Sequence, residues 1–259
     1  MQHLINQSNA QYLIYQNNSQ FGHIFVYEND DYFWLKFSDV SIQGIIKKTQ
    51  PEIAYSPIIK SLLLFLLQQT QQLKVLNLGL GCANIDRTLR YLHNNKLISL
   101  NAITTVELNP TIIALAQQYF NLPNETKVVN QCAQSYLATN TSQFDIIIID
   151  IFSDQQHLDF IETAQFWQQL KFSAKINTII SANLSFDSPL KLQNLLCTIK
   201  QNFPYIKLIE FTQYKNIVLL ASQSPLTHVN INNVRENKKL NLITHELPQA
   251  IKTIHAIEP

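Results

Sequence analysis

Glycine and charged residues are both scarce in this chain of 259 residues. Only four glycines occur, and charged side chains make up 14% of the residues, with a formal net charge of +1. A net charge so close to zero creates no overall field that would attract nucleic acid or an anionic membrane surface, so neither is expected as a partner. The scarcity of glycine makes each one informative, because glycine is used where the backbone turns sharply or approaches another group closely.

Cysteines are few and long apolar runs are missing. The three cysteines, Cys82, Cys132 and Cys197, are odd in number and lack the spacing of a metal site, so we expect reduced thiols and no bound metal. The N-terminal segment has no basic region followed by an apolar core, which argues against a signal peptide. The apolar run SLLLFLL at residues 61–67 is too short to span a bilayer. These features predict a cytoplasmic protein with no membrane partner.

The stretch KVLNLGLGCANIDRTL, at residues 74–89, organises the rest of the chain. Alternating apolar residues predict a buried strand, Gly79 and Gly81 end it, and a helical pattern begins near Asn84. Residues 102–107 predict the next strand, with Glu107 at its carboxyl end. Together they predict a βαβ unit, in which an acidic residue at this position can accept both hydroxyls of a ribose.

The glycine motif is incomplete as a dinucleotide fingerprint. Asn84 stands at the third glycine position of G-x-G-x-x-G, and no Lys-Ser/Thr pair follows the turn. Glu107 lies 26 residues after Gly81, close to the spacing of roughly 20 that is typical of a nucleoside site. The pattern therefore disfavours pyrophosphate and favours an adenosine ligand without phosphates, such as an S-adenosyl compound.

The pattern of the whole chain predicts an α/β fold in two parts and a tail. Residues 1–50 are short aromatic and β-branched runs between polar turns, which predict a small antiparallel β-hairpin domain. Residues 51–224 begin with a helical stretch at 51–72 and then alternate strands and helices, which predicts a Rossmann-like nucleoside-binding domain. Its run FDIIIID at 144–150 is typical of a strand covered on both faces. Residues 225–259 form a C-terminal tail to which the pattern assigns no role.

Five motifs in this order resemble the spermidine synthase (polyamine aminopropyltransferase) family, over about residues 20–222. They are VSIQG, VLNLGLG with Arg87 downstream, TTVELNP, VVNQCAQSYL and FDIIIIDIFSD. More specifically, the chain resembles a spermidine-synthase-like branch with altered substrate motifs. The resemblance implies a small β-hairpin domain followed by a Rossmann-like, class I methyltransferase-type domain, which agrees with the pattern of strands and helices.

The resemblance also assigns residues to a donor site. It places around the donor Gln43, Gly79, Gly81, Cys82, Glu107, Cys132, Ala133 and Asp150. Two of these depart from the family pattern. Cys82 stands where the family has an aspartate that contacts the amine of the donor, and Cys132 stands where it has an aspartate on the adenine amino group. We interpret both as small buried residues near the nucleoside, because free cysteine packs like a small apolar group.

The catalytic residues expected from the resemblance are Asp150 and Asp154. Asp150 matches the aspartate that holds and deprotonates the attacking amine, and the second aspartate of that motif falls on Ser153, one residue before Asp154. An aspartate after a parallel strand can instead cap the following turn or helix. His157 could also act as a general base, although a single loop histidine is more often incidental.

The resemblance implies an enzyme that transfers an aminopropyl group from decarboxylated S-adenosylmethionine to a small amine, as in polyamine biosynthesis. It implies no permanently bound cofactor and a homodimer. Two alternatives stay open. A methyltransferase that uses intact S-adenosylmethionine would need a basic or amide group for the donor's carboxylate, and Asn84 or Arg87 could supply it. A non-catalytic nucleoside-binding protein would keep the fold without needing Asp150 as a base.

Overall fold

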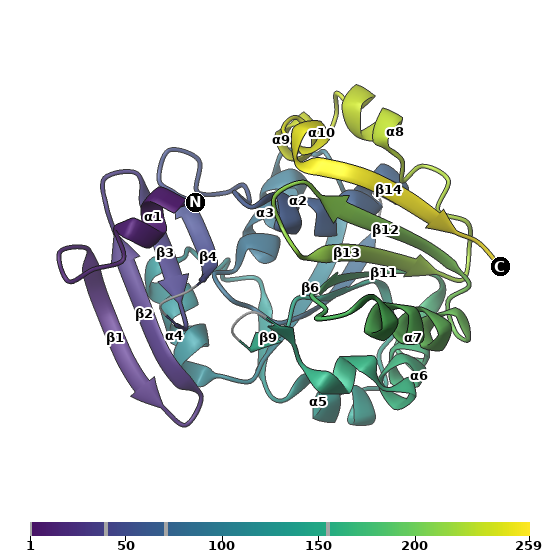
Figure 1. The fold of residues 1–259 in the computed structure, drawn as a ribbon, viewed down its shortest axis with the longest axis horizontal. Helices are drawn as coiled ribbons and strands as arrows, with labels where there is room; N and C mark the ends of the chain where they lie inside the picture. Colours follow the sequence, from purple (N-terminus) through teal and green to yellow (C-terminus); the bar gives the residue numbers. More distant parts are fainter. Residues whose placement is uncertain (1, 39–40, 70–71, 154–155) are drawn as a thin grey trace.

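Most of the described strands belong to two β-sheets, one of four strands near the N-terminus and one of eight strands (Figure 1). The computed structural model describes residues 2–38, 41–69, 72–153 and 156–259. The larger sheet is flanked by helices, and its central strands are parallel. The α/β class predicted from the sequence, with a small antiparallel sheet before a Rossmann-like unit, is confirmed.

The N-terminal sheet is fully antiparallel and packs on both of its faces. Helix α1 (Gln2–Asn6) precedes strands β1 (Leu13–Ser19), β2 (Gly22–Glu28), β3 (Tyr32–Lys36) and β4 (Ile42–Lys47). On one face, Tyr27 and Trp34 stack at 5.4 Å between ring centroids and pack with Leu4 from α1. On the other face, Val26 and Ile46 pack against the larger unit. Tyr27 and Trp34 are therefore core residues of this sheet.

The segment between the two sheets is less helical than predicted. Helix α2 (Pro57–Leu62) and the 3₁₀ turn η1 (Leu64–Leu67) replace the single helix expected over residues 51–72. The Oγ of Ser56 accepts a hydrogen bond from the Ile58 amide at 3.3 Å and so sets the start of α2. The apolar run at residues 61–67 favoured a longer helix. Its side chains are nearly all buried in the structure, and a run of buried apolar residues is compatible with short helical turns as well as with one long helix.

The large sheet has the strand order β14-β12-β13-β11-β8-β5-β6-β7. Its strands are β5 (Leu73–Leu78), β6 (Leu100–Glu107), β7 (Lys127–Asn130), β8 (Phe144–Ile149), β11 (Ala174–Leu184), β12 (Tyr205–Phe211), β13 (Ile217–Ser222) and β14 (Ile251–Ile257). Strands β5, β6, β7, β8 and β11 are parallel, whereas β13, β12 and β14 follow as antiparallel neighbours. A short hairpin, β9 (Phe152–Ser153) and β10 (Gln156–His157), follows β8.

Helices cover both faces of this sheet. They are α3 (Asn84–Asn94), α4 (Pro110–Tyr119), α5 (Ala133–Thr139), α6 (Ala164–Phe172) and α7 (Pro189–Lys200), with the 3₁₀ turn η2 (Asp159–Glu162) before α6. Successive residues of β8 alternate between two cores, so that Ile146 packs with α2 and α3 and Ile147 packs with α5, α6 and α7. The prediction of a strand buried on both faces is confirmed for β8. Helix α6 begins directly after Thr163, because the Oγ1 of Thr163 caps it by accepting from the Phe166 amide at 3.3 Å.

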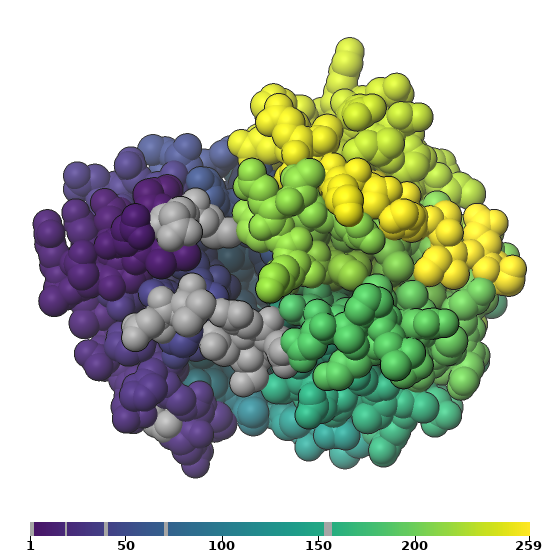
Figure 2. Space-filling view, viewed as in Figure 1, coloured from purple at the N-terminus to yellow at the C-terminus, as the bar shows by residue number. Residues whose placement is uncertain are grey.

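The last 35 residues are part of the core, although the sequence pattern suggested no element there. They form α8 (Ile231–Glu236), α9 (Asn241–Thr244), α10 (Leu247–Ala250) and the edge strand β14. Val234, Ile243 and Leu247 are buried in the core beside α2 and η1. The helices span only four to six residues each, which is too short for a periodic signal. Figure 1 shows β14, in yellow, at the edge of the sheet beside β12, and Figure 2 shows the atoms of this segment, in yellow, at the surface next to the green atoms.

The two sheets meet over a shared apolar core. Side chains from β2, β3 and β4 pack there with Leu80 and Cys82 of the glycine turn and with Ile112 and Phe120 of the α4 region. Gly44 in β4 lies directly against Cys82, since a Cβ added to this glycine would overlap the Sγ atom. The N-terminal sheet is thus packed on the turn that follows β5. Within the described ranges, no helix is long and apolar enough to cross a membrane.

Candidate functional site

A cavity of about 920 Å³ lies between the N-terminal sheet and one edge of the large sheet. Its wall includes residues of the β1–β2 turn and of β4 on one side. On the other side it includes the residues that follow or end β5, β6, β8 and β11, and the loop between β12 and β13. Open α/β sheets place their ligands at the carboxyl ends of the parallel strands, so this cavity is the candidate site.

Gly79 and Gly81 both lie in the wall of the cavity, but different constraints act on them. Gly79 has φ +100°, and a Cβ there would overlap the carbonyl oxygen of Asp150. Its amide donates to the Val106 carbonyl at 2.9 Å. Gly81 has φ +50°, and a Cβ there would meet nothing within 4 Å. Position 79 therefore requires glycine, because the backbone after β5 and the backbone after β8 come into contact there, whereas Gly81 leaves open space above the turn.

Glu107 is held by the two loops on either side of it. Its Oε2 atom accepts a hydrogen bond from the Leu80 amide at 3.1 Å, and its Oε1 atom accepts one from the Asn109 amide at 2.8 Å. Burial raises the pKa of this carboxyl group, and the backbone hydrogen bonds partly offset the rise. These backbone hydrogen bonds orient the Glu107 carboxylate in the wall of the cavity.

Asp150 begins a chain of polar side chains along the edge of the sheet. Its Oδ1 atom accepts from the Asn183 amide group at 2.9 Å, and the Oδ1 atom of Asn183 accepts from the Asn216 amide group at 2.9 Å. All three side chains lie in the cavity wall. Burial raises the pKa of Asp150, and the hydrogen bond from Asn183 partly counteracts it. A carboxyl group of raised pKa, oriented by an amide, has the properties of a general base.

Arg87 is buried and fully engaged with the protein itself. Its Nε atom donates to the Pro51 carbonyl at 2.8 Å, and its Nη1 atom donates to the Cys82 and Phe120 carbonyls. Its Nη2 atom donates to the Oδ1 atom of Asn84 at 2.7 Å. Arg87 is therefore not placed to bind the carboxylate of a ligand. Asn84 does lie in the cavity wall, and because Arg87 holds its oxygen, its NH₂ group is the part that remains for a ligand.

The two cysteines assigned to the donor site lie outside the described wall of the cavity. Cys82 is 2% exposed and faces Gly44, and burial raises the pKa of its thiol. Cys132 is partly buried just before α5, and Ala133 is buried at the start of that helix. Cys82, Cys132 and Ala133 do not belong to the described wall of the cavity, so their contact with a donor stays a prediction. Among the described residues, no three His, Cys, Asp or Glu side chains gather as metal ligands.

The remaining expected residues divide between the cavity and the core. Gln43 lies in the cavity wall and donates from its Nε2 atom to the Ser41 hydroxyl at 2.9 Å. Asp154 lies outside the described residues. His157 is 6% exposed, its Nδ1 atom accepts from the Ser185 amide at 3.1 Å, and its Nε2 atom lies 3.1 Å from the Glu162 carboxylate. Both ring nitrogens are thus engaged, and His157 is not placed to act as a base.

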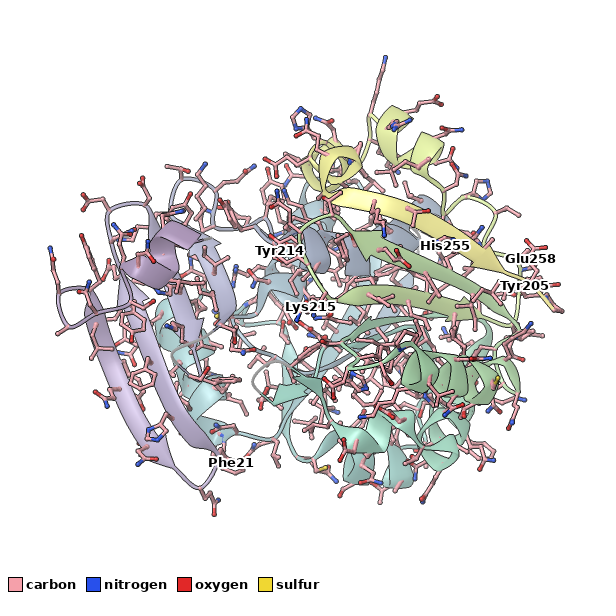
Figure 3. All side chains as sticks on the ribbon, in the orientation of Figure 1. Phe21, Tyr205, Tyr214, Lys215, His255 and Glu258 are labelled. Carbon is pink, nitrogen blue, oxygen red and sulfur yellow. The ribbon has the colours of Figure 1, made fainter. Side chains whose placement is uncertain are left out.

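Several residues of the cavity wall were not found from the sequence. Asn183 could have been, since it lies near the carboxyl end of the parallel strand β11, where open α/β sheets bind their ligands. Phe21, Tyr214 and Lys215 also line the cavity. In Figure 3, Phe21 lies at the turn between β1 and β2, and Tyr214 and Lys215 lie on the loop between β12 and β13, which points toward the N-terminal sheet. No sequence pattern pointed to the loop of Tyr214 and Lys215. This loop precedes β13, and it lies at the same edge of the sheet as the ends of the parallel strands only because β13 runs antiparallel to β11.

Solved structures with the same fold include several transferases. A probable spermidine synthase from Corynebacterium glutamicum matches with a TM-score of 0.75 and 16% identity, over 94% of this chain and 90% of its own. A spermidine synthase in complex with the transition state analogue AdoDATO matches with 0.61 and 18%, over 88% and 78%. Human methyltransferase-like protein 13 in complex with SAH matches with 0.54 and 20%, over 74% and 88%.

These similarities are similarities of fold. No protein-family model matches the sequence, and no curated protein matches it either. The chain has the fold of the spermidine synthases, including the small sheet before a methyltransferase-type core, as its sequence motifs predicted.

Proposed function

We propose that the chain is a transferase that moves an aminopropyl group from decarboxylated S-adenosylmethionine to a small amine. The observation that carries the proposal is Asp150, a carboxyl group of raised pKa in the cavity wall directly beside the glycine turn. The fold shared with a spermidine synthase bound to AdoDATO and with a methyltransferase bound to SAH supports an S-adenosyl co-substrate. A homodimer and a place in polyamine biosynthesis remain part of the proposal.

The nucleoside half of the donor would lie over β5 and β6. Gly81 leaves open space there, so a ligand can approach the backbone of the turn. Glu107 presents an oriented carboxylate for the ribose hydroxyls. Leu108, which is 47% exposed and lies in the cavity wall, offers apolar surface to the base. The residues present thus fit an adenosine ligand without phosphates.

The transfer is a displacement at the carbon beside a sulfonium. The nitrogen of the acceptor forms a bond to that carbon, the carbon–sulfur bond breaks with its electron pair going to sulfur, and the nitrogen loses a proton. Amines are protonated near pH 7, so a base must accept this proton and align the nitrogen. Asp150 is suited to the role because burial raises its pKa and Asn183 fixes the direction of its carboxylate.

The test of the proposed base is the substitution Asp150→Asn. The variant keeps the shape of the side chain but cannot accept a proton, so turnover should fall by roughly 100-fold or more. Calorimetric titration should show that donor binding is retained. Asp159→Asn is a matched control, because Asp159 is exposed in the same region and lies outside the described wall. Unchanged turnover in Asp150→Asn would show that Asp150 is not the base and would contradict the proposed mechanism.

One observation favours methyl transfer as a second candidate. The NH₂ group of Asn84 lies where it could donate to the carboxylate of intact S-adenosylmethionine, which the decarboxylated donor lacks. Separate calorimetric titrations with the two donors distinguish the reactions. Tighter binding of the decarboxylated donor supports aminopropyl transfer, and tighter binding of the intact donor supports methyl transfer. Binding of neither would leave the non-catalytic alternative as the better interpretation.

A further inference from the structure

The loop between β12 and β13, at residues 213–216, forms the part of the cavity wall farthest from the nucleoside half. In the strand order, β5 and β6 carry Gly81 and Glu107, whereas β8, β11 and β13 follow on the other side. Asp150 immediately follows β8, and Asn216 immediately precedes β13. An acceptor that presents its nitrogen to Asp150 would therefore extend over β11 and β13, toward this loop.

Both neighbours of Lys215 in this loop are anchored. The ring of Tyr214 packs edge-on against Phe211, at 6.0 Å between centroids, and joins the core beneath the loop. Asn216 donates to Asn183, which in turn donates to Asp150. The backbone of Lys215 is therefore fixed relative to the proposed base, although its side chain is exposed at the rim of the cavity (Figure 3).

Lys215 brings a positive charge to the acceptor half of the cavity. It forms no ion pair with any described residue. Apart from the proposed base Asp150, the other described polar side chains on this side are neutral, namely the amides of Gln213, Asn183 and Asn216 and the hydroxyls of Ser185 and Tyr214. A polyamine would place a second ammonium group close to Lys215, and two like charges in a partly enclosed cavity repel. An anionic group would form a charge-assisted hydrogen bond there instead.

We infer that the acceptor is an aminocarboxylate, whose amine faces Asp150 and whose carboxylate binds Lys215. The inference rests on the proposed aminopropyl transfer and names its substrate class. Two strand spacings separate β8 from β13, which corresponds to roughly 10 Å between their backbones. The side chain of Lys215 spans part of that distance, so the acceptor is a short ω-amino acid. Its nitrogen forms the bond to the propyl carbon, sulfur takes the electron pair of the broken bond, and Asp150 takes the proton.

The experiment compares two acceptors of similar length, 4-aminobutyrate and 1,4-diaminobutane, with decarboxylated S-adenosylmethionine as donor. Wild-type protein should use 4-aminobutyrate with a kcat/KM about tenfold or more higher. Lys215→Met should raise the KM for 4-aminobutyrate by about 10- to 100-fold with little change in kcat, because it removes a binding charge and not the base. Lys215→Glu should reverse the preference toward the diamine. Lys238→Met, an exposed lysine outside the described cavity wall, should change neither value.

Several outcomes would overturn the inference. One is a preference of the wild type for the diamine, and another is an unchanged preference in Lys215→Met. A third is that Lys215→Met weakens binding of intact S-adenosylmethionine only, because Lys215 would then bind the donor. If neither amine is turned over, the affinity of each amine is measured on protein saturated with methylthioadenosine. Tighter binding of the diamine, or binding of neither amine, would contradict the inference. Failure of the proposed function is distinct, since it appears as loss of donor binding or as an unaffected Asp150→Asn.

Discussion

At the scale of single residues, the two glycines of the turn after β5 have separable roles. Alanine at position 79 would have a strained φ and would overlap the carbonyl of Asp150, whereas alanine at position 81 would have only the strained φ. Gly79→Ala should lower the free energy of unfolding by about 2–5 kcal/mol, and Gly81→Ala by about 1–2 kcal/mol. Urea denaturation measures both. Donor titration should show that Gly81→Ala folds but binds the donor weakly, because its methyl group occupies the open space.

Gly22→Ala is the control for this pair. Gly22 also has a positive φ, of +95°, and a Cβ there would meet nothing within 4 Å, but it lies in the N-terminal sheet. It should lose about as much stability as Gly81→Ala. If Gly79→Ala were no less stable than Gly22→Ala, the close approach of β5 to Asp150 would not constrain the turn.

Asp86, in the first turn of α3 after the glycine turn, makes the stability of the fold depend on pH. It is fully buried, its Oδ1 atom accepts from the Thr105 hydroxyl at 2.5 Å, and its Oδ2 atom accepts from the Asn77 amide group at 3.0 Å. Burial raises the pKa of Asp86 from 3.8 to about 6, although these hydrogen bonds oppose the rise. Between these two pH values the folded state holds a proton that the unfolded state has released. The contribution of Asp86 therefore destabilises the fold as pH rises from about 4 to about 6, by about 3 kcal/mol in all.

Asp86→Asn should remove this contribution. The buried Oδ1 atom of Asn77 has no hydrogen-bond partner, so rotation of that amide lets it accept from the new NH₂ group. The variant's free energy of unfolding, relative to wild type, should rise by about 2–3 kcal/mol between pH 4 and pH 7. Denaturation at both pH values measures the difference, with the exposed Asp30→Asn as control. A relative stability that does not change with pH would show that Asp86 is not the group responsible.

At the scale of elements, Arg87 on α3 connects three separate segments through their carbonyls. Pro51 lies before α2, Cys82 lies in the glycine turn, and Phe120 follows α4. Burial lowers the pKa of Arg87 to about 10, so it stays charged at neutral pH. Its planar fork can serve several acceptors at once, which the single ammonium of lysine cannot. This side chain therefore couples the region before α2 to the floor of the cavity.

Arg87→Lys should lower the free energy of unfolding by about 2–4 kcal/mol, because buried carbonyls lose their donors. Thermal or urea denaturation measures the loss, and donor titration should show weaker binding as the glycine turn loosens. Arg90→Lys is the matched control. Arg90 is only partly buried on the same helix, and its Nε atom has no partner to lose. Equal effects of the two substitutions would mean that the hydrogen bonds of Arg87 contribute little.

The predictability of an element from the sequence depended on how the element is buried. Strand β8 was predicted almost to the residue, because a run of four isoleucines covered on both faces has few alternatives. The ends of three parallel strands, β5, β6 and β8, also marked candidate residues, and the structure places Gly79, Glu107 and Asp150 in one cavity wall. Lys215 could not be found in this way. It enters the site from a loop before an antiparallel strand, and only the strand pairing reveals that position.

At the scale of the whole molecule, the C-terminal segment supplies the edge strand of the large sheet. Strand β14 pairs antiparallel with β12 from Ile206 to Phe211, and without it β12 would be the edge. The sequence pattern missed this strand because tertiary pairing, and not local periodicity, defines it. An uncovered β12 would present unpaired backbone groups of a hydrophobic strand to solvent.

Removal of residues 251–259 should therefore lower stability and promote aggregation. The loss of one paired strand and of buried Ile251 should lower the denaturation midpoint, and size-exclusion chromatography should show higher-order species. Removal of residues 258–259 alone, beyond β14, should leave both measurements nearly unchanged. A monodisperse, fully stable protein without residues 251–259 would show that β14 is dispensable for the sheet.

The contact between Gly44 and Cys82 has a consequence for how the two sheets separate. Because β4 covers the sulfur, and burial disfavours its thiolate, a thiol reagent can reach Cys82 only when the N-terminal sheet moves away from the glycine turn. Cys197 is exposed and Cys132 is partly exposed, so both should be alkylated before it and serve as internal standards. The rate at which Cys82 is alkylated therefore measures how often the N-terminal sheet moves away from the glycine turn and opens the cavity. A ligand that bridges the two sheets should lower this rate.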